Sequence, residues 1–274
     1  MSPIVEKAGR FYLNETEKTG LYLTWLSCND FGALRKIENQ VLLKKAWANI
    51  KGRLPHYFKN HVISLDSIVK TFKKINLTIN PKIDCAYDPE KDMLIYNLWS
   101  LFFSSTNDEF ATPKPPWQIA GLLIHEYDHY LFFRKSAMIG KTEKEYEEFN
   151  REHLNELEKR AYSNQIAFLE KCKKKVPSKA LTYKIRIRKW SPDGKPIDHE
   201  IPVIPMAKKG IINQINQVIL QYRNVLRKIE VGKGYDDFSR EDSMKSHLKI
   251  IDLLSLPIKL DPSKDNYPRI EITM

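Results

Sequence analysis

The clearest hydrophobic pattern in the chain is an apolar run at residues 119–133, which two histidines and two acidic residues interrupt only at its centre. The loop before this run contains three prolines within residues 113–116. Proline is tolerated in the first turn of a helix and disfavoured in its interior, so the pattern predicts a helix that begins at this loop. On such a helix His125 and His129 lie one turn apart and share a face.

Upstream of this run, the pattern predicts helices followed by a β-hairpin. Residues 1–75 have mainly helical periodicity, and Ser64 is a predicted N-cap. Apolar segments at 77–87 and 93–97 flank an Asp-Pro turn and predict the hairpin. A strand beside a metal-binding helix can bind an extended peptide through its backbone, and a purely structural hairpin fits the same pattern equally well.

Downstream of the run, residues 142–174 predict one long helix, which opens with a capping-box sequence at Thr142. The helical period places Glu158 at the edge of the apolar stripe, whereas Glu152 and Glu156 project roughly the opposite way, into solvent. We therefore expect Glu158, of these three glutamates, to reach a site in the interior. An ordinary surface glutamate is the alternative.

After residue 175 the sequence first alternates between apolar and basic residues and then becomes helical. Residues 183–190 and 197–204 predict a second hairpin, and residues 209–230 and 239–256 predict two helices. The basic face of this hairpin carries Lys184, Arg186 and Arg188. These side chains can contact phosphates, although a solvated outer face is the simpler interpretation.

Composition and charge narrow the class of protein. The net charge is +11, and residues 171–274 hold 22 Lys and Arg against 12 Asp and Glu. The basic character thus belongs to the C-terminal part, where an anionic partner is the alternative to a plain lysine-rich surface. Three cysteines without C-x-x-C spacing argue against a disulfide framework or a thiolate zinc site. No run of 18 apolar residues and no secretory leader pattern occur, so we expect a cytoplasmic protein with no membrane segment.

The candidate chemistry lies in residues 125–129, which form an H-E-x-x-H arrangement. Two imidazoles one turn apart can ligate one metal ion, and Glu126, about 100° around the helix, can reach a water bound to that ion. Burying two histidines and two acids in an apolar helix is costly unless they are paired or bound to something. The pattern therefore predicts a metal site, with a pair of hydrogen-bonded core histidines as the alternative.

This motif, followed by the glutamate of the Glu-Lys-Arg-Ala segment that begins at Glu158, resembles the gluzincin zinc metallopeptidases. The resemblance covers about residues 77–172. It implies a zincin-like domain in which His125, His129 and Glu158 bind Zn²⁺ and Glu126 acts as the general base.

The chain departs from the family pattern in one respect. The acid that often follows the glutamate ligand by four residues is Tyr162 here, so the partner of the first histidine is not identified. Tyr162, Tyr183 and His199 are candidates for the donor that stabilises the transition state. The related metzincins require a third histidine shortly after His129, and residues 130–140 contain none.

Together, the patterns and the resemblance predict an α+β chain that is mainly helical. A small antiparallel sheet is expected ahead of the histidine helix, with a zincin-like domain at 1–175 and a basic hairpin-plus-helices extension at 176–274 packed on it. The predicted function is a hydrolase that cleaves peptide or protein substrates with a zinc-bound water activated by Glu126. The alternative is a non-enzymatic protein that binds nucleic acid or a protein partner, with a structural or vestigial metal site.

Overall fold

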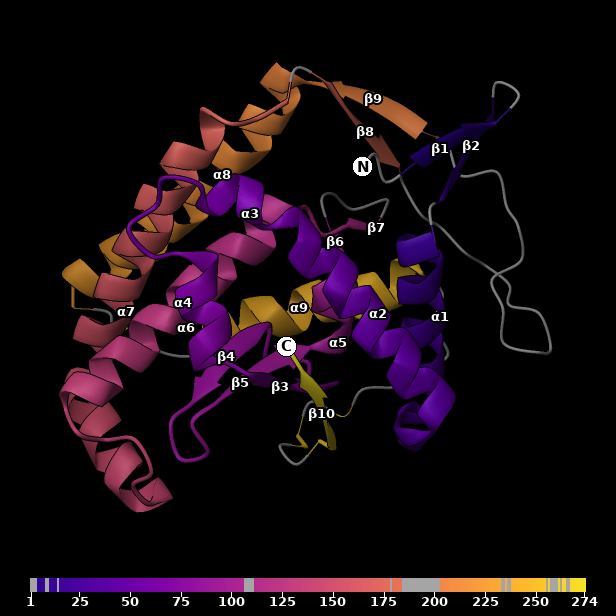
Figure 1. The fold of residues 1–274 in the computed structure, drawn as a ribbon. Helices are drawn as coiled ribbons and strands as arrows, with labels where there is room; N and C mark the ends of the chain where they lie inside the picture. Colours follow the sequence, from indigo (N-terminus) through magenta and orange to yellow (C-terminus); the bar gives the residue numbers. More distant parts are fainter. Residues whose placement is uncertain are drawn as a thin grey trace.

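A computed structural model describes residues 4–7, 10–13, 15–105, 111–177, 179–183, 203–232, 235, 238–254, 256, 261, 263–264 and 267–274. The helices are α1 (Glu15–Asn29), the 3-10 helix η1 (Phe31–Arg35), α2 (Ile37–Arg53), α3 (Pro55–Phe58), α4 (Leu65–Thr71), α5 (Leu98–Phe102), α6 (Pro116–Lys135), α7 (Glu143–Lys173), α8 (Lys208–Glu230) and α9 (Phe238–Leu253). The strands are β1 (Ile4–Lys7), β2 (Arg10–Leu13), β3 (Lys74–Thr78), β4 (Cys85–Asp88), β5 (Met93–Asn97), β6 (Phe103–Ser105), β7 (Ala111–Pro113), β8 (Lys179–Tyr183), β9 (Val203–Ala207) and β10 (Arg269–Thr273). Most of the described residues are helical, and one four-stranded sheet lies among the helices (Figure 1).

The sheet has the strand order β10-β3-β5-β4. β4 and β5 form the predicted hairpin, and Asp92 in its turn has a positive φ of 48°. β3 lies parallel to β5, so the sheet is mixed, and our prediction of an antiparallel sheet is wrong for this pair. Pro81 interrupts the apolar segment 77–87, and the chain turns there before it enters β4. β4 lies at the edge of the sheet, next to β5.

The N-terminal part is less helical than the sequence pattern of residues 1–75 predicts. β1 and β2 pair antiparallel as a ribbon before α1, since their β-branched and aromatic residues favour extended backbone. The helices that follow agree with the prediction, and Ser64 caps α4 by accepting a hydrogen bond from the backbone N–H of Ser67. α2 packs through one face that includes Trp47 and Ile50.

The hydrophobic core extends between the sheet and the helices. Its largest fully buried side chains include Trp47, Phe72, Tyr96, Trp99 and Phe168. Helix α6 contacts β4, α3 and α4 as well as the long helix α7. The predicted histidine helix is thus held by neighbours in the core rather than at the surface.

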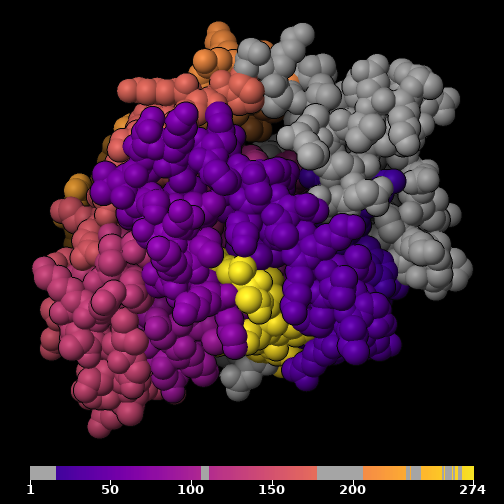
Figure 2. Space-filling view, viewed as in Figure 1, coloured from indigo at the N-terminus to yellow at the C-terminus, as the bar shows by residue number. Residues whose placement is uncertain are grey.

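Several described elements of the C-terminal part contact the rest of the chain, and one of them, β8, contacts β7. α8 packs on α7, α9 packs on β6 and α5, and β10 pairs antiparallel with β3. Figure 2 shows yellow residues of the C-terminal end filling a gap between indigo and purple residues of the N-terminal half. The helices predicted at 209–230 and 239–256 are confirmed as α8 and α9. The division of the chain at residue 175 stays a prediction.

The predicted basic hairpin is described only in part. β8 and β9 pair antiparallel, whereas Lys184, Arg186 and Arg188 lie outside the described residues. Across the described residues, every helix is too short or too polar to cross a lipid bilayer.

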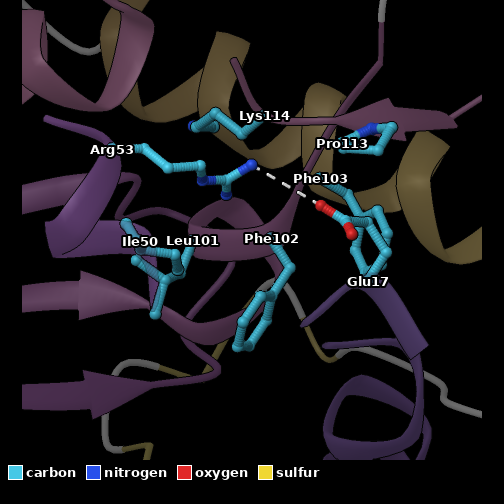
Figure 3. Close-up of a pocket in the computed structure, with 8 residues that line it drawn as sticks. All are labelled: Glu17, Ile50, Arg53, Leu101, Phe102, Phe103, Pro113 and Lys114. Carbon is cyan, nitrogen blue, oxygen red and sulfur yellow. Dashed lines mark ion pairs between the residues drawn. The ribbon is translucent and has the colours of Figure 1, made fainter. Parts of the chain in front are cut away.

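A small pocket between α1 and α2 contains a buried ion pair (Figure 3). Nη1 of Arg53 lies 3.6 Å from Oε1 of Glu17, whose side chain is 4% exposed. Burial raises the pKa of Glu17 from 4.5 to about 7, although the charge of Arg53 and a backbone hydrogen bond oppose this shift. Folding therefore favours the neutral form of this acid.

Candidate metal centre

Helix α6 carries the predicted metal ligands at its centre. It begins with Pro116 at its first position, because the missing N–H of proline costs no helical hydrogen bond there, and it ends with two basic residues that suit the C-terminal dipole. His125, Glu126 and His129 are 6%, 4% and 7% exposed. Three polar side chains are thus buried where the surrounding helix is apolar, which demands compensation from neighbouring groups or a bound ion.

Helix α7 lies close to α6 at Gly121. A Cβ built on Gly121 would lie 3.4 Å from Cδ2 of Leu169 and 3.5 Å from Nε2 of Gln165. The space beside this glycine is therefore occupied by side chains of α7. The capping box of Thr142 and Glu145 sets the start of α7 as predicted.

Glu158 projects from α7 towards both histidines. Its Oε2 lies 3.3 Å from Nε2 of His125, and its Oε1 lies 3.5 Å from Nε2 of His129. The carboxylate is buried, whereas the side chains of Glu152 and Glu156 are 78% and 70% exposed. The helical phase that the sequence predicts for the three glutamates agrees with their positions, and the role of Glu158 as a ligand stays a prediction.

The ligand atoms of His125, Glu126 and His129 lie within 4.8 Å of one another. The two imidazole rings meet edge to face, with centroids 4.5 Å apart. This His-Glu-His cluster can bind a metal ion. The Glu158 carboxylate lies beside this cluster, so four side chains that can coordinate a metal or accept a proton from its bound water surround one small region between α6 and α7.

The hydrogen-bonding pattern of the cluster leaves a place for a cation between His125 and Glu158. Nδ1 of His125 lies 3.0 Å from Oε1 of Gln165. If Nδ1 donates this bond in the neutral ring, Nε2 carries a lone pair that faces Oε2 of Glu158, and two acceptors then face each other. Among the described side chains, Oε2 of Glu158 has no hydrogen-bond partner. A positive charge between these atoms would remove the conflict.

The pKa values of the two histidines shift in opposite directions. Burial lowers the pKa of His125, but the nearby Glu158 carboxylate outweighs burial and raises it overall. Burial and the nearby charges of His125 and Arg160 hold the pKa of His129 well below its usual range. The cluster thus favours one positive charge beside Glu158 and keeps His129 neutral, which is the form that ligates a metal.

Glu126 connects the histidine helix to the edge of the sheet. Its Oε2 accepts a hydrogen bond of 2.8 Å from the backbone N–H of Tyr87 in β4. Burial raises the pKa of Glu126 to about 8; the charge of His125 and this hydrogen bond oppose the shift, and the charge of Glu158 adds to it. Glu126 is thus a carboxyl group that is shielded from solvent, has a raised pKa and is hydrogen-bonded to β4.

Two groups of outer partners hold the cluster in place. Gln165 contacts His125 and donates a hydrogen bond of 3.2 Å from Nε2 to the hydroxyl of Tyr222 in α8. Asp128 binds Arg160 and Asn164 of α7. The sequence pattern predicts no role for these residues, although Gln165 follows Glu158 by two helical turns and so shares its face. The contribution of Tyr222 leaves no local signal in the sequence.

Aromatic side chains close one side of the cluster. The ring of Tyr162 meets that of His125 edge to face, with centroids 4.6 Å apart, and also lies near Tyr222 and Tyr235. Of the three candidates for the transition-state donor, the structure places Tyr162 at the site. The side chain of Tyr183 and all of His199 lie outside the described residues.

Comparison with known proteins adds no relative to these findings. A scan against protein-family models and searches of curated proteins and of solved structures found no match to this chain. The resemblance to gluzincins therefore depends on the H-E-x-x-H cluster and on the position of Glu158. What the structure itself establishes is a buried His-Glu-His cluster that can bind a metal ion.

Proposed function

We propose that this chain is a zinc-dependent metallopeptidase. The observation that carries the proposal is the convergence of three side chains from two helices, since Nε2 of His125 and Nε2 of His129 both face the carboxylate of Glu158 at 3.3 and 3.5 Å. Glu126 lies beside them. Such a set provides three ligands and a separate acid–base group.

The donor set favours zinc among the common metals. Two imidazoles and one carboxylate are the ligands of many catalytic zinc sites, which keep a fourth position open. When bound, zinc acts as a Lewis acid and lowers the pKa of a coordinated water from 15.7 to about 7. His125, His129 and Glu158 would hold it.

Glu126 is the proposed general base. Its carboxylate is held by the Tyr87 N–H and shielded from solvent, so it can accept a proton from the attacking water. The same carboxylate can then deliver that proton to the leaving amine, which restores its ionised form. Proton transfer thus begins and ends at one residue.

The strand β4 is the proposed binding surface for the substrate backbone. β4 lies at the edge of the sheet, pairs with β5 and contacts α6. An extended peptide can add to such an edge through main-chain hydrogen bonds. Glu126 already accepts the Tyr87 N–H, so a peptide would pair with the other backbone groups of β4 and would lie near the base. This arrangement supports a peptide or protein substrate.

The substitution Glu126→Gln tests the proposal. We expect near-complete loss of chelator-sensitive cleavage of casein, with zinc content unchanged, because an amide cannot accept the proton. Glu156→Gln is the matched control, since its side chain is 70% exposed on α7. Protein purified without added metal and found by elemental analysis to contain no zinc would refute the proposal.

A non-enzymatic protein with a structural metal site is the second candidate. The observation that favours it is the burial of the cluster, because a structural zinc site has four protein ligands and no position open to water or substrate. In that case a chelator would lower the unfolding temperature, and the metal-loaded protein would cleave nothing. An anionic partner such as nucleic acid at the basic C-terminal part belongs to this candidate and would show as salt-sensitive binding without cleavage.

A further inference from the structure

A buried glutamine lies between the His125-Glu126-His129 cluster and helix α8. Gln165 is 1% exposed, and its side-chain amide lies between two polar groups. Its Oε1 is 3.0 Å from Nδ1 of His125, and its Nε2 donates to the hydroxyl of Tyr222 at 3.2 Å. Both ends of the amide are therefore used, one towards the predicted ligand and the other towards the C-terminal part of the chain.

We propose that Gln165 is a positioning residue that fixes His125 in its metal-binding tautomer, and that Tyr222 holds the Gln165 side chain in place for this task. The proposal rests on the proposed zinc site. It assigns Gln165 the function that an outer hydrogen-bond acceptor has for a ligating histidine.

The tautomer of His125 decides whether the ring can bind a metal through Nε2. Nε2 faces Glu158 and must offer a lone pair to a metal, so the proton must reside on Nδ1. Nδ1–H is buried and needs an acceptor, which the Oε1 of Gln165 provides. The same amide could instead turn its NH₂ group towards the ring, which would favour the wrong tautomer.

Tyr222 holds the other end of the Gln165 amide in place. With Oε1 on His125, the Nε2–H of Gln165 has an acceptor in the Tyr222 oxygen. Tyr162, which follows Glu158 by four residues, presents its ring to His125 and not an acceptor to Nδ1. Gln165, one turn further along α7, provides the acceptor instead. A glutamine also adds no third negative charge beside Glu126 and Glu158.

The test is the zinc affinity of the full chain, measured by competition with a chromogenic chelator. Gln165→Leu removes the acceptor and should weaken binding roughly 10- to 100-fold. Gln165→Glu restores an acceptor and should return the affinity to within about 3-fold of the wild type, a rescue that follows from the acceptor requirement of Nδ1–H. Gln217→Leu, at an exposed position of α8, is the matched control and should leave the affinity unchanged.

A double-variant cycle separates positioning from general destabilisation. Tyr222→Phe should weaken zinc binding by less than Gln165→Leu, and it should have no further effect when Gln165→Leu is already present, because Tyr222 acts through the amide. Nitrogen chemical shifts of the zinc-bound protein should show His125 protonated at Nδ1 in the wild type. Urea unfolding in a chelator confirms that each variant folds.

The outcomes distinguish this proposal from the proposed function. A wild type that binds zinc while Gln165→Leu has the same affinity overturns only the assignment of Gln165. Additive effects of Gln165→Leu and Tyr222→Phe overturn the role of Tyr222. A wild type that takes up no zinc overturns the metal site itself, together with everything that depends on it.

Discussion

Replacing Arg160 with alanine should cost more folding free energy than replacing Asp128, although the two residues form one ion pair. The Asp128 carboxylate, whose side chain is 4% exposed, accepts hydrogen bonds from Nε and Nη2 of Arg160 at 2.8 and 3.2 Å. It also accepts one of 2.8 Å from Asn164. The Arg160 side chain is 35% exposed. The pair joins α6 to α7 one residue before His129.

The difference in exposure between Asp128 and Arg160 determines how much folding free energy each substitution costs. Arg160→Ala leaves a buried carboxylate with the Asn164 amide and little water, and it also removes the guanidinium that lies 5.2 Å from the Phe132 ring. Breaking a buried ion pair in this way costs about 3–5 kcal/mol. Asp128→Ala leaves a guanidinium that water can reach, so the cost is nearer the roughly 1.5–3 kcal/mol of a lost charge-assisted hydrogen bond.

The assay is urea unfolding in the presence of a chelator, so that metal binding does not contribute to the free energy. Lys159→Ala is the control, because Lys159 is 56% exposed and its ion pair with Glu230 is at the surface. That change should stay within about 0.5 kcal/mol. The double variant of Asp128 and Arg160 should cost less than the sum of the single variants. An Asp128→Ala variant less stable than Arg160→Ala would show that burial of the carboxylate does not determine the cost.

Three further predictions concern the ligand, the buried acid and the helix contact. Glu158→Ala should remove most of the bound zinc and Glu156→Ala should not; equal zinc contents by elemental analysis would contradict the assignment. Because the pKa of Glu17 is raised from 4.5 to about 7, the unfolded state loses this proton first, and this residue should lower stability by about 2 kcal/mol between pH 5 and pH 7. Glu17→Gln should abolish that part of the pH dependence in urea unfolding, and an unchanged slope would contradict the shift. Gly121→Ala should be neutral or stabilise α6 by up to about 1 kcal/mol, since its Cβ would lie 3.4 Å from Leu169 in ordinary contact. Gly121→Val adds branches with no space and should cost about 1–3 kcal/mol in thermal unfolding; equal stability of both variants would show that the helices can separate freely.

The parts of the site that the sequence predicts are those with a local physical cause. Proline and the capping box set the starts of α6 and α7, and the 3.6-residue period orients Glu158 inward. The same period places Gln165 on the face of Glu158, but it does not show which group the amide meets. That contact depends on how closely α7 approaches Gly121, which is a property of two packed helices.

Other features depend on pairing between distant segments. Tyr222 reaches the site only because α8 packs on α7. The parallel pairing of β3 with β5 follows from the turn at Pro81, and the sequence between them shows the hairpin without showing which strand lies next to it. The strand β10 has an alternating pattern, with Ile270 and Ile272 buried. This pattern predicts a strand but does not predict that β3 is its partner.

The pairing of β10 with β3 has a consequence for how the protein forms during synthesis. β3 comprises residues 74–78 and β10 comprises residues 269–273, so a ribosome that has released β3, β4, β5 and the histidine helix has not yet made the strand that covers the other edge of β3. Until then, that edge offers unpaired backbone groups to any extended chain nearby. Contacts of such long sequence separation also form slowly. The His125-Glu126-His129 cluster can therefore be complete in its own residues while one edge of the sheet that contacts Glu126 is still open.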